Sequence, residues 1–126
     1  QAPAGRSSIV NVLDQRVFKP TPLFLSYAIS KAALHSATHM LAQALAPGIR
    51  VNGVAPGPTL PSPRQSADDF ANQSARLPLG RNASADDVAR AVLYLASADG
   101  VTGTVIPVDG GQHIAWQTPE ISGIRE

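Results

Sequence analysis

The chain has 126 residues, of which 44% are hydrophobic and 15% charged, with a net charge of +1 and no cysteine. This composition is typical of a folded domain and excludes a disordered chain, and the missing cysteines exclude disulfides, thiolate metal ligands and a cysteine nucleophile. No apolar run is long enough to span a bilayer, and the first residues do not match a signal peptide. We therefore expect a cytoplasmic protein without a membrane partner. The basic side chains neither cluster nor alternate with aromatic ones, so we expect no nucleic-acid partner.

The first part of the chain predicts a strand, a helix and a second strand. Residues 7–13 form a short β-branched run, which is typical of a strand. Residues 15–24 contain two prolines and predict a loop. Residues 25–46 contain neither glycine nor proline and are followed by Pro47-Gly48, which predicts a long helix. Residues 49–55 predict the second strand after a very short turn.

The second part of the chain predicts two helices and a last strand. Residues 56–63 contain four prolines and predict a stiff loop. Ser66 and Ser84 each precede an acidic residue by three positions, the pattern of a helix N-cap, so we expect helices that end near residues 76 and 96. Residues 104–108 predict a strand whose Pro107 indicates an edge position or a bulge.

This order of elements predicts the α/β class. Long helices between short apolar strands indicate parallel strands joined by right-handed crossovers. A parallel sheet needs cover on both faces, and three strands are few for an independent domain. We therefore expect residues 1–116 to form the C-terminal half of a Rossmann-type, doubly wound parallel sheet. Residues 117–126 show no periodicity and are expected to form an extended tail.

Tyr27 and Lys31 are candidates for catalysis because they lie four residues apart near the start of the predicted helix. That spacing places both side chains on one helix face. An ammonium group near a phenol stabilises the phenolate, so Lys31 is expected to lower the pKa of Tyr27 from about 10 toward neutrality. Such a tyrosine can donate or accept a proton at a carbonyl or an imine. By itself the pair also fits an ordinary surface contact.

Four motifs give the pair a context: residues 26–34 read SYAISKAAL, residues 49–57 IRVNGVAPG, residues 78–81 PLGR, and residues 102–111 TGTVIPVDGG. In this order they resemble the active-site helix, the next strand with its Pro-Gly turn, a later turn before a capped helix, and the last strand of the short-chain dehydrogenase/reductase family. The resemblance implies a dinucleotide-binding fold and an NAD(P)-dependent oxidoreductase.

The resemblance also implies roles for individual residues. Tyr27 would be the general acid in reduction and the base in oxidation. Lys31 would bind the ribose hydroxyls of a nicotinamide cofactor and depress the pKa of Tyr27. The backbone after Pro56 and Gly57 would pass along the nicotinamide and pyrophosphate, with Thr59 as a hydroxyl contact. A backbone that approaches a ligand closely leaves no room for a Cβ atom, which is an independent reason for glycine at position 57.

Asp14 departs from the usual pattern of the family. It lies thirteen residues before Tyr27, where the family usually has serine. A carboxylate cannot donate a hydrogen bond unless it is protonated, but it can accept one from an N–H group. Pteridine reductases and the short-chain dihydrofolate or dihydromonapterin reductases resemble this chain in carrying aspartate there. The interpretation is a reductase of a pterin-like or dihydrofolate-like C=N bond, with Asp14, Tyr27 and Lys31 as its catalytic set. The alternatives are a general carbonyl or 3-oxoacyl reductase and a non-catalytic dinucleotide-binding regulator or subunit.

Other candidate residues have simpler interpretations. His35 and His39 have the spacing of a metal pair, but no further ligand stands nearby in the sequence, and no metal site is expected. His113 and Trp116 follow the last turn and either border the substrate pocket or a neighbouring subunit, or simply pack. Arg16 could reach an anionic group, although an ordinary surface arginine is the default interpretation.

One family motif is missing from the chain. The glycine-rich phosphate turn that follows the first strand of the family's fold does not occur. The resemblance therefore implies that the N-terminal half of the same protein is a required partner. NADP(H) is favoured over NAD(H) as cofactor. The alanine-rich helix over residues 25–46 suggests a homodimer or homotetramer.

Overall fold

The computed structural model describes residues 7–60 and 62–125. Each predicted helix and strand is confirmed, and every boundary lies within one residue of its prediction. The elements in chain order are β1 (Ser7–Val12), the 3-10 helix η1 (Gln15–Val17), α1 (Leu25–Leu45), β2 (Ile49–Pro56), α2 (Ala67–Ala75), α3 (Ala85–Ser97), β3 (Val105–Val108) and the 3-10 helix η2 (Gln112–Ile114).

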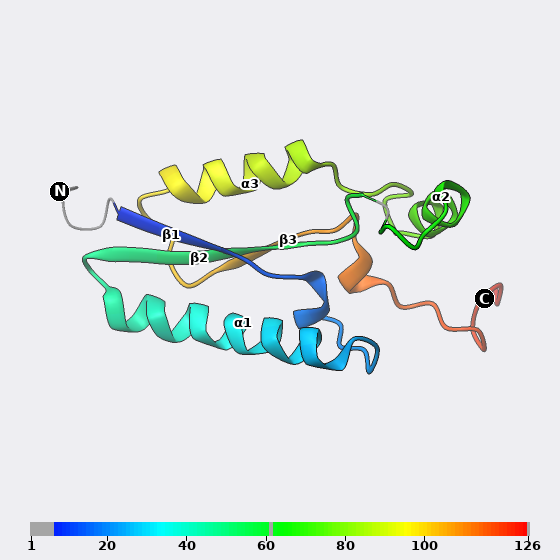
Figure 1. Cartoon of the computed structure of the whole chain (residues 1–126), viewed down its shortest axis with the longest axis horizontal. Coiled ribbons are helices and arrows are strands. Elements are labelled where there is room, and N and C mark those ends of the chain that lie inside the picture. Colours follow the sequence, from blue (N-terminus) through cyan, green and yellow to red (C-terminus); the bar gives the residue numbers. More distant parts are fainter. Residues whose placement is uncertain (1–6, 61, 126) are drawn as a thin grey trace.

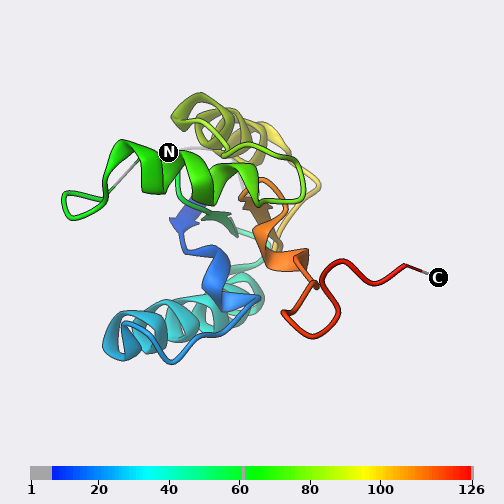
Figure 2. The ribbon, with the colours of Figure 1, turned by 90° about the vertical axis from the view of Figure 1, so that its right-hand side faces the viewer.

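The three strands form one parallel sheet in the order β1-β2-β3. Ser7 pairs with Ile49 in the first ladder, and Gly53 pairs with Val105 in the second. The helix α1 covers one face of this sheet and α3 covers the other (Figure 1). This is the layered arrangement of a Rossmann-type fold, and the view along the sheet shows it end-on (Figure 2). The short β3 lies at an edge of the described sheet, as its proline predicted.

The core lies around the central strand β2, which is buried over most of its length. Val51 and Val54 on β2 and Leu95 on α3 are completely buried. The alternate faces of one strand thus contact both helix layers, because successive side chains of a strand point to opposite sides.

Two polar side chains of β2 are also buried, and they bind the end of α3 and the segment that follows it. The guanidinium of Arg50 donates hydrogen bonds to the carbonyls of Leu95 and Ala96, at 2.8 and 2.9 Å. These carbonyls lie in the last turn of α3, where a positive charge is favourable. Asn52 Nδ2 donates to the carbonyl of Val101 at 2.9 Å. The sequence analysis gave neither residue a role, although the structure makes both of them links between β2 and the approach to β3.

Both predicted N-caps are confirmed. Ser66 Oγ accepts a hydrogen bond from the backbone N–H of Asp69, and Ser84 Oγ accepts one from that of Asp87, each at 3.0 Å. At the second site the carboxylate of Asp87 also accepts from the Ser84 N–H at 2.9 Å, which completes a capping box. Among the described helices, none is both long and apolar enough to cross a membrane.

Candidate active site

The candidate site lies where the three parallel strands end. Asp14 follows β1, Gly57 follows β2 and Asp109 follows β3. The first two turns of α1, which carry Tyr27 and Lys31, lie at the same end of the sheet (Figure 1). Ligands of open α/β sheets bind outside the carboxyl ends of the strands, so this is the expected place for a site.

The structure brings Asp14 and Tyr27 together. The Tyr27 hydroxyl donates a hydrogen bond to Asp14 Oδ2 across 3.3 Å. The other carboxylate oxygen, Oδ1, accepts from the backbone N–H of Arg16 at 2.8 Å, so that Asp14 caps η1. This second bond fixes the carboxylate and explains how a residue in a turn can hold a fixed position against α1. The Tyr27 side chain remains 45% exposed and is accessible to a ligand.

Lys31 lies close to the same pair but binds elsewhere. Its Nζ donates to the carbonyl of Val12 at 2.9 Å, at the end of β1. The ammonium also lies 5.7 Å from the centre of the Tyr27 ring, within the range of a cation–π contact. Since an ammonium has three N–H donors, two are left for a further partner.

The predicted effect of Lys31 on the tyrosine is wrong in this arrangement. The pKa of Tyr27 is raised above its ordinary value of 10.0, first by partial burial and then by the charge and the hydrogen bond of Asp14. Arg16 opposes this rise and lowers the pKa in part. The sequence indicated that Asp14 could hold the tyrosine, but the predicted pKa took only the lysine four residues away into account and not the carboxylate that accepts from the hydroxyl. The phenol therefore keeps its proton at neutral pH.

Gly57 is needed for a reason that differs from the prediction. A Cβ atom built at this position would lie 2.8 Å from Cβ and 2.9 Å from Cα of Asp109. The backbone there also follows the ladder closely, since the Gly57 N–H donates to the carbonyl of Val108 at 3.0 Å. The contact that excludes a side chain is thus made by the chain's own turn after β3. Close approach of a ligand at Gly57 stays a prediction.

Pro56 and Thr59, the other predicted cofactor contacts, lie beside this turn. Pro56 is the last residue of β2 and pairs with Val108 of β3. Thr59 lies in the loop that follows and is partly buried. Their contact with a cofactor stays a prediction.

A buried carboxylate–histidine pair adjoins the site. Asp109 is only 2% exposed and accepts from the backbone N–H groups of Gly111 and His113. The ring Nδ1 of His113 lies 2.8 Å from Asp109 Oδ2. In the tautomer that carries its proton on Nδ1, the ring donates a hydrogen bond to the carboxylate. The sequence analysis noticed His113 but missed this pair; the signal was a histidine four residues after the aspartate of a Gly-Gly turn.

A small pocket opens next to Asp14 and is called the Asp14 pocket below. Its volume is about 150 Å³. Its lining comes from η1, the turn after β2, α2 and η2, and consists of Asp14, Gln15, Arg16, Gly57, Pro58, Gln73 and Gln112. Three of these side chains are glutamines, which the sequence analysis did not single out.

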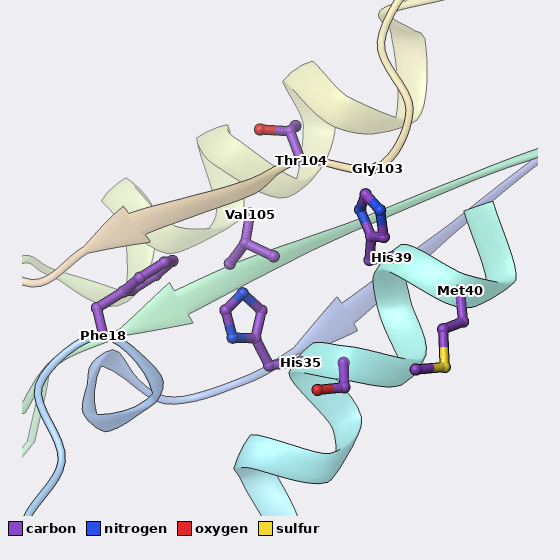
Figure 3. Close-up of a pocket in the computed structure, with 8 residues that line it drawn as sticks. Phe18, His35, His39, Met40, Gly103, Thr104 and Val105 are labelled. Atoms are coloured by element: carbon purple, nitrogen blue, oxygen red, sulfur yellow. The ribbon is translucent and has the colours of Figure 1, made fainter. Parts of the chain in front are cut away.

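The two histidines of α1 line a different cavity of about 530 Å³ (Figure 3). His35 and His39 face it together with Phe18, whose ring stacks edge-on against His35 with the centroids 5.2 Å apart. Within residues 7–60 and 62–125, no group of three histidine or acidic side chains could hold a metal ion. The sequence indicated a helix face or an interface for the two histidines, and the structure places them on the face of α1 that borders this cavity.

The remaining two candidates are also placed by the structure. The guanidinium of Arg16 lies 5.1 Å from the centre of the Phe24 ring, which is a cation–π contact. Trp116 is 71% exposed, so the predicted packing of this side chain is not found within the chain.

The fold and the sequence together place the chain in a known class. A family model described as Enoyl-(Acyl carrier protein) reductase matches residues 2–113. The chain belongs to the short-chain dehydrogenase/reductase family. Protein FixR of Bradyrhizobium diazoefficiens is 44% identical over 115 residues, and L-xylulose reductase of Caenorhabditis elegans is 37% identical over 115 residues. The alignments cover 88% and 84% of this chain but only 41% and 45% of the relatives.

A solved structure of a reductase is also similar to this chain. The FolM alternative dihydrofolate reductase 1 from Brucella suis, crystallised in complex with NADP, is 51% identical and superposes with a TM-score of 0.89. The superposition covers 95% of this chain and 49% of the Brucella chain. The chain thus spans about half the length of the relatives that it matches.

Proposed function

We propose that this chain is the catalytic half of an NADP(H)-dependent reductase that acts in the cytoplasm on the C=N bond of a pterin-like or dihydrofolate-like substrate. The observation that carries the proposal is the hydrogen bond of 3.3 Å between the Tyr27 hydroxyl and Asp14 at the carboxyl end of the sheet. A protonated phenol is a proton donor, and a carboxylate beside it is an acceptor for N–H groups. Ring nitrogens of pterins offer both a site to protonate and N–H groups to bind.

The site suits a nicotinamide cofactor on the side of Lys31. Two N–H donors of its ammonium are left after the bond to Val12, and they can bind the two hydroxyls of a ribose. The cofactor, when bound, would supply the hydride to the substrate carbon. The preference for NADP(H) rests on the NADP complex of the Brucella suis relative, which is 51% identical.

The side chains of the site would then handle the proton. Asp14 would accept a hydrogen bond from an N–H group of the substrate ring and so hold the ring beside Tyr27. The Tyr27 hydroxyl donates its proton to the ring nitrogen of the C=N bond while the carbon receives the hydride, which leaves a phenolate and a reduced C–N bond. Lys31, whose ammonium lies 5.7 Å from the centre of the Tyr27 ring, would then be the nearby positive charge for this phenolate until solvent returns a proton. In the site as it stands, burial and Asp14 outweigh any such effect on the pKa of Tyr27.

The proposal includes an N-terminal half that completes the sheet, and the term complete enzyme below means both halves together. Ile9 and Val12 of β1 are 40% and 52% exposed although they lie on a strand of the sheet. β1 is also an edge strand of the described sheet. A further parallel strand beside it would pair its free backbone groups, and the helices of that half would cover the apolar side chains on the two faces. Such a half would also bring the phosphate-binding turn that this chain lacks.

We also propose that the complete enzyme forms a homodimer or homotetramer through α1. Three apolar side chains on this helix, Leu25, Ile29 and Met40, are each about 60% exposed. A larger apolar surface of this kind usually marks an interface. A monomer in light scattering would contradict this part of the proposal.

The test is a panel of substrates. The complete enzyme should oxidise NADPH with dihydropterins and dihydrofolate and be slow with simple ketones. Tyr27→Phe should abolish turnover but retain cofactor affinity, because the ring stays and only the proton donor is lost; the conserved affinity controls for misfolding. An active Tyr27→Phe enzyme would contradict the role of Tyr27.

A carbonyl reductase is the second candidate. It is favoured by the likeness to L-xylulose reductase of Caenorhabditis elegans, at 37% identity over 115 residues. Good turnover of ketones together with none of dihydropterins would reject the pterin assignment and support this one. No turnover of any substrate, with tight dinucleotide binding, would instead support a non-catalytic regulator or subunit.

A further inference from the structure

Two glutamines that line the Asp14 pocket each carry a buried side-chain oxygen without a hydrogen-bond partner among the described residues. These oxygens are Oε1 of Gln15 and Oε1 of Gln112. Gln15 as a whole is only 5% exposed. Both side chains line the pocket, together with the carboxylate of Asp14.

Such oxygens are unusual because burial removes the water that would otherwise satisfy them. Most buried polar side-chain atoms in proteins have a partner, and one without a partner costs about 1–3 kcal/mol. Gln73, which also lines the pocket, has a hydrogen-bond partner: its Oε1 accepts from Gln65 Nε2 at 2.9 Å. The two unpartnered amides thus differ from their neighbour, and both belong to the same small pocket.

The side chains that line the Asp14 pocket indicate which kind of ligand it can bind. A terminal amide presents a carbonyl and an NH₂ group side by side, and a rotation of its last bond turns either one toward the pocket. This pair is complementary to the edge of a nitrogen heterocycle, in the way that glutamine pairs with adenine. Asp14 adds an acceptor that is already fixed by its bond to the Arg16 N–H, at 2.8 Å.

The volume limits how much of the ligand can enter. The pocket measures about 150 Å³, whereas sites for whole small molecules usually have roughly 300–1,000 Å³. It therefore has room for one ring edge, and the rest of a substrate would extend toward Tyr27, whose hydroxyl is bonded to Asp14.

We propose that Gln15 and Gln112, with Asp14, form a subsite that binds the N–H and carbonyl edge of a nitrogen heterocycle. In this subsite the two glutamines select substrates that carry a 2-amino-pyrimidinone ring over substrates that lack it. The inference rests on the proposed function for the position of the reacting bond, but the selectivity that it assigns to the two glutamines can be measured separately.

The test compares two ligands in the complete enzyme: a dihydropterin and its analogue without the 2-amino group. Calorimetric affinity with NADP⁺ present and KM values are measured for the parent, for Gln15→Met and for Gln112→Met. Methionine has a similar volume but no hydrogen-bonding oxygen. The matched control is Gln43→Met, on an exposed position of α1. Each pocket variant should weaken the dihydropterin about fivefold, which corresponds to one neutral hydrogen bond, and leave the analogue nearly unchanged.

Thermal unfolding separates binding from a structural role. Since each Oε1 has no partner to lose, Gln15→Met and Gln112→Met should melt no lower than the parent. Lower melting temperatures together with equal losses for both ligands would overturn the inference in favour of a packing role. Unchanged affinity for the dihydropterin in both variants would overturn it as well.

Failure of this inference differs from failure of the proposed function. A parent enzyme that reduces dihydropterins, with glutamine variants that keep its selectivity, rejects the subsite alone. A parent enzyme that reduces only ketones rejects the proposed function, and the calorimetry then still decides whether the pocket prefers the 2-amino ligand. A parent that neither binds nor reduces dihydropterins rejects both.

Discussion

Replacing Gly57 by alanine tests whether the turn after β2 is constrained by the chain itself. The new Cβ would lie 2.8 Å from Cβ and 2.9 Å from Cα of Asp109, whereas carbon atoms in contact prefer about 3.5–4.0 Å. Asp109 cannot retreat easily, because its carboxylate accepts from two backbone N–H groups and the ring of His113. Overpacking of this kind costs about 1–3 kcal/mol. For a complete enzyme of roughly 250 residues, this is a fall of about 2–4 °C in melting temperature per kcal/mol.

The assay is thermal and urea unfolding of the complete enzyme, with cofactor affinity measured in parallel. Gly48→Ala is the matched control, because its Cβ would meet only the Leu45 carbonyl oxygen at 3.5 Å, an ordinary contact. We expect Gly57→Ala to melt lower than both the parent and Gly48→Ala without any ligand present. An unchanged melting temperature with a large loss of cofactor affinity would refute this reasoning. The reason for glycine at position 57 would then be the close approach of a ligand.

Two further predictions concern Asp14 and Arg50. The pKa of Tyr27 is raised first by burial and then by the charge and the hydrogen bond of Asp14, so Asp14→Asn should lower it part of the way toward 10.0. Phenolate absorbance during a pH titration, with Tyr27→Phe as the blank, measures this pKa, and an unchanged midpoint would contradict the role of Asp14. Because burial and Asp14 raise the pKa of Tyr27, the protonated side chain contributes to stability below pH 10, and this contribution is lost as the pH rises further. Arg50→Met leaves the carbonyls of Leu95 and Ala96 without their donor, so urea unfolding should show a loss of about 3 kcal/mol, while the exposed Arg64→Met should show almost none.

The helices and strands could be predicted because the signals that set them are local. Pro47-Gly48 follows the last turn of α1, and the side chains of Ser66 and Ser84 bind backbone groups three residues away. The fold class followed in the same way, since long helices between short strands leave only a few ways to build a sheet. None of these inferences needed a contact between distant segments.

The site could be predicted only where a single helix or the resemblance determined it. The spacing of Tyr27 and Lys31 placed them on one face, and the resemblance drew attention to Asp14. The environment of Tyr27 depends instead on a contact between η1 and α1, and the need for glycine at position 57 depends on the turn after β3. Gln15 and Gln112 meet in one pocket although nearly a hundred residues separate them, and no local pattern marks such a pair.

The raised pKa of Tyr27 is consistent with its proposed role as the proton donor in reduction. A proton donor must hold its proton before the reaction, and a phenol whose pKa lies above 10.0 does so throughout the neutral range. Oxidation would need the phenolate as base, and the negative charge of Asp14 disfavours that form. A serine at this position would carry no such charge. In the proposed reaction, Asp14 in place of serine would therefore have two roles: it would accept hydrogen bonds from substrate N–H groups and, together with burial of the hydroxyl, disfavour the phenolate of Tyr27.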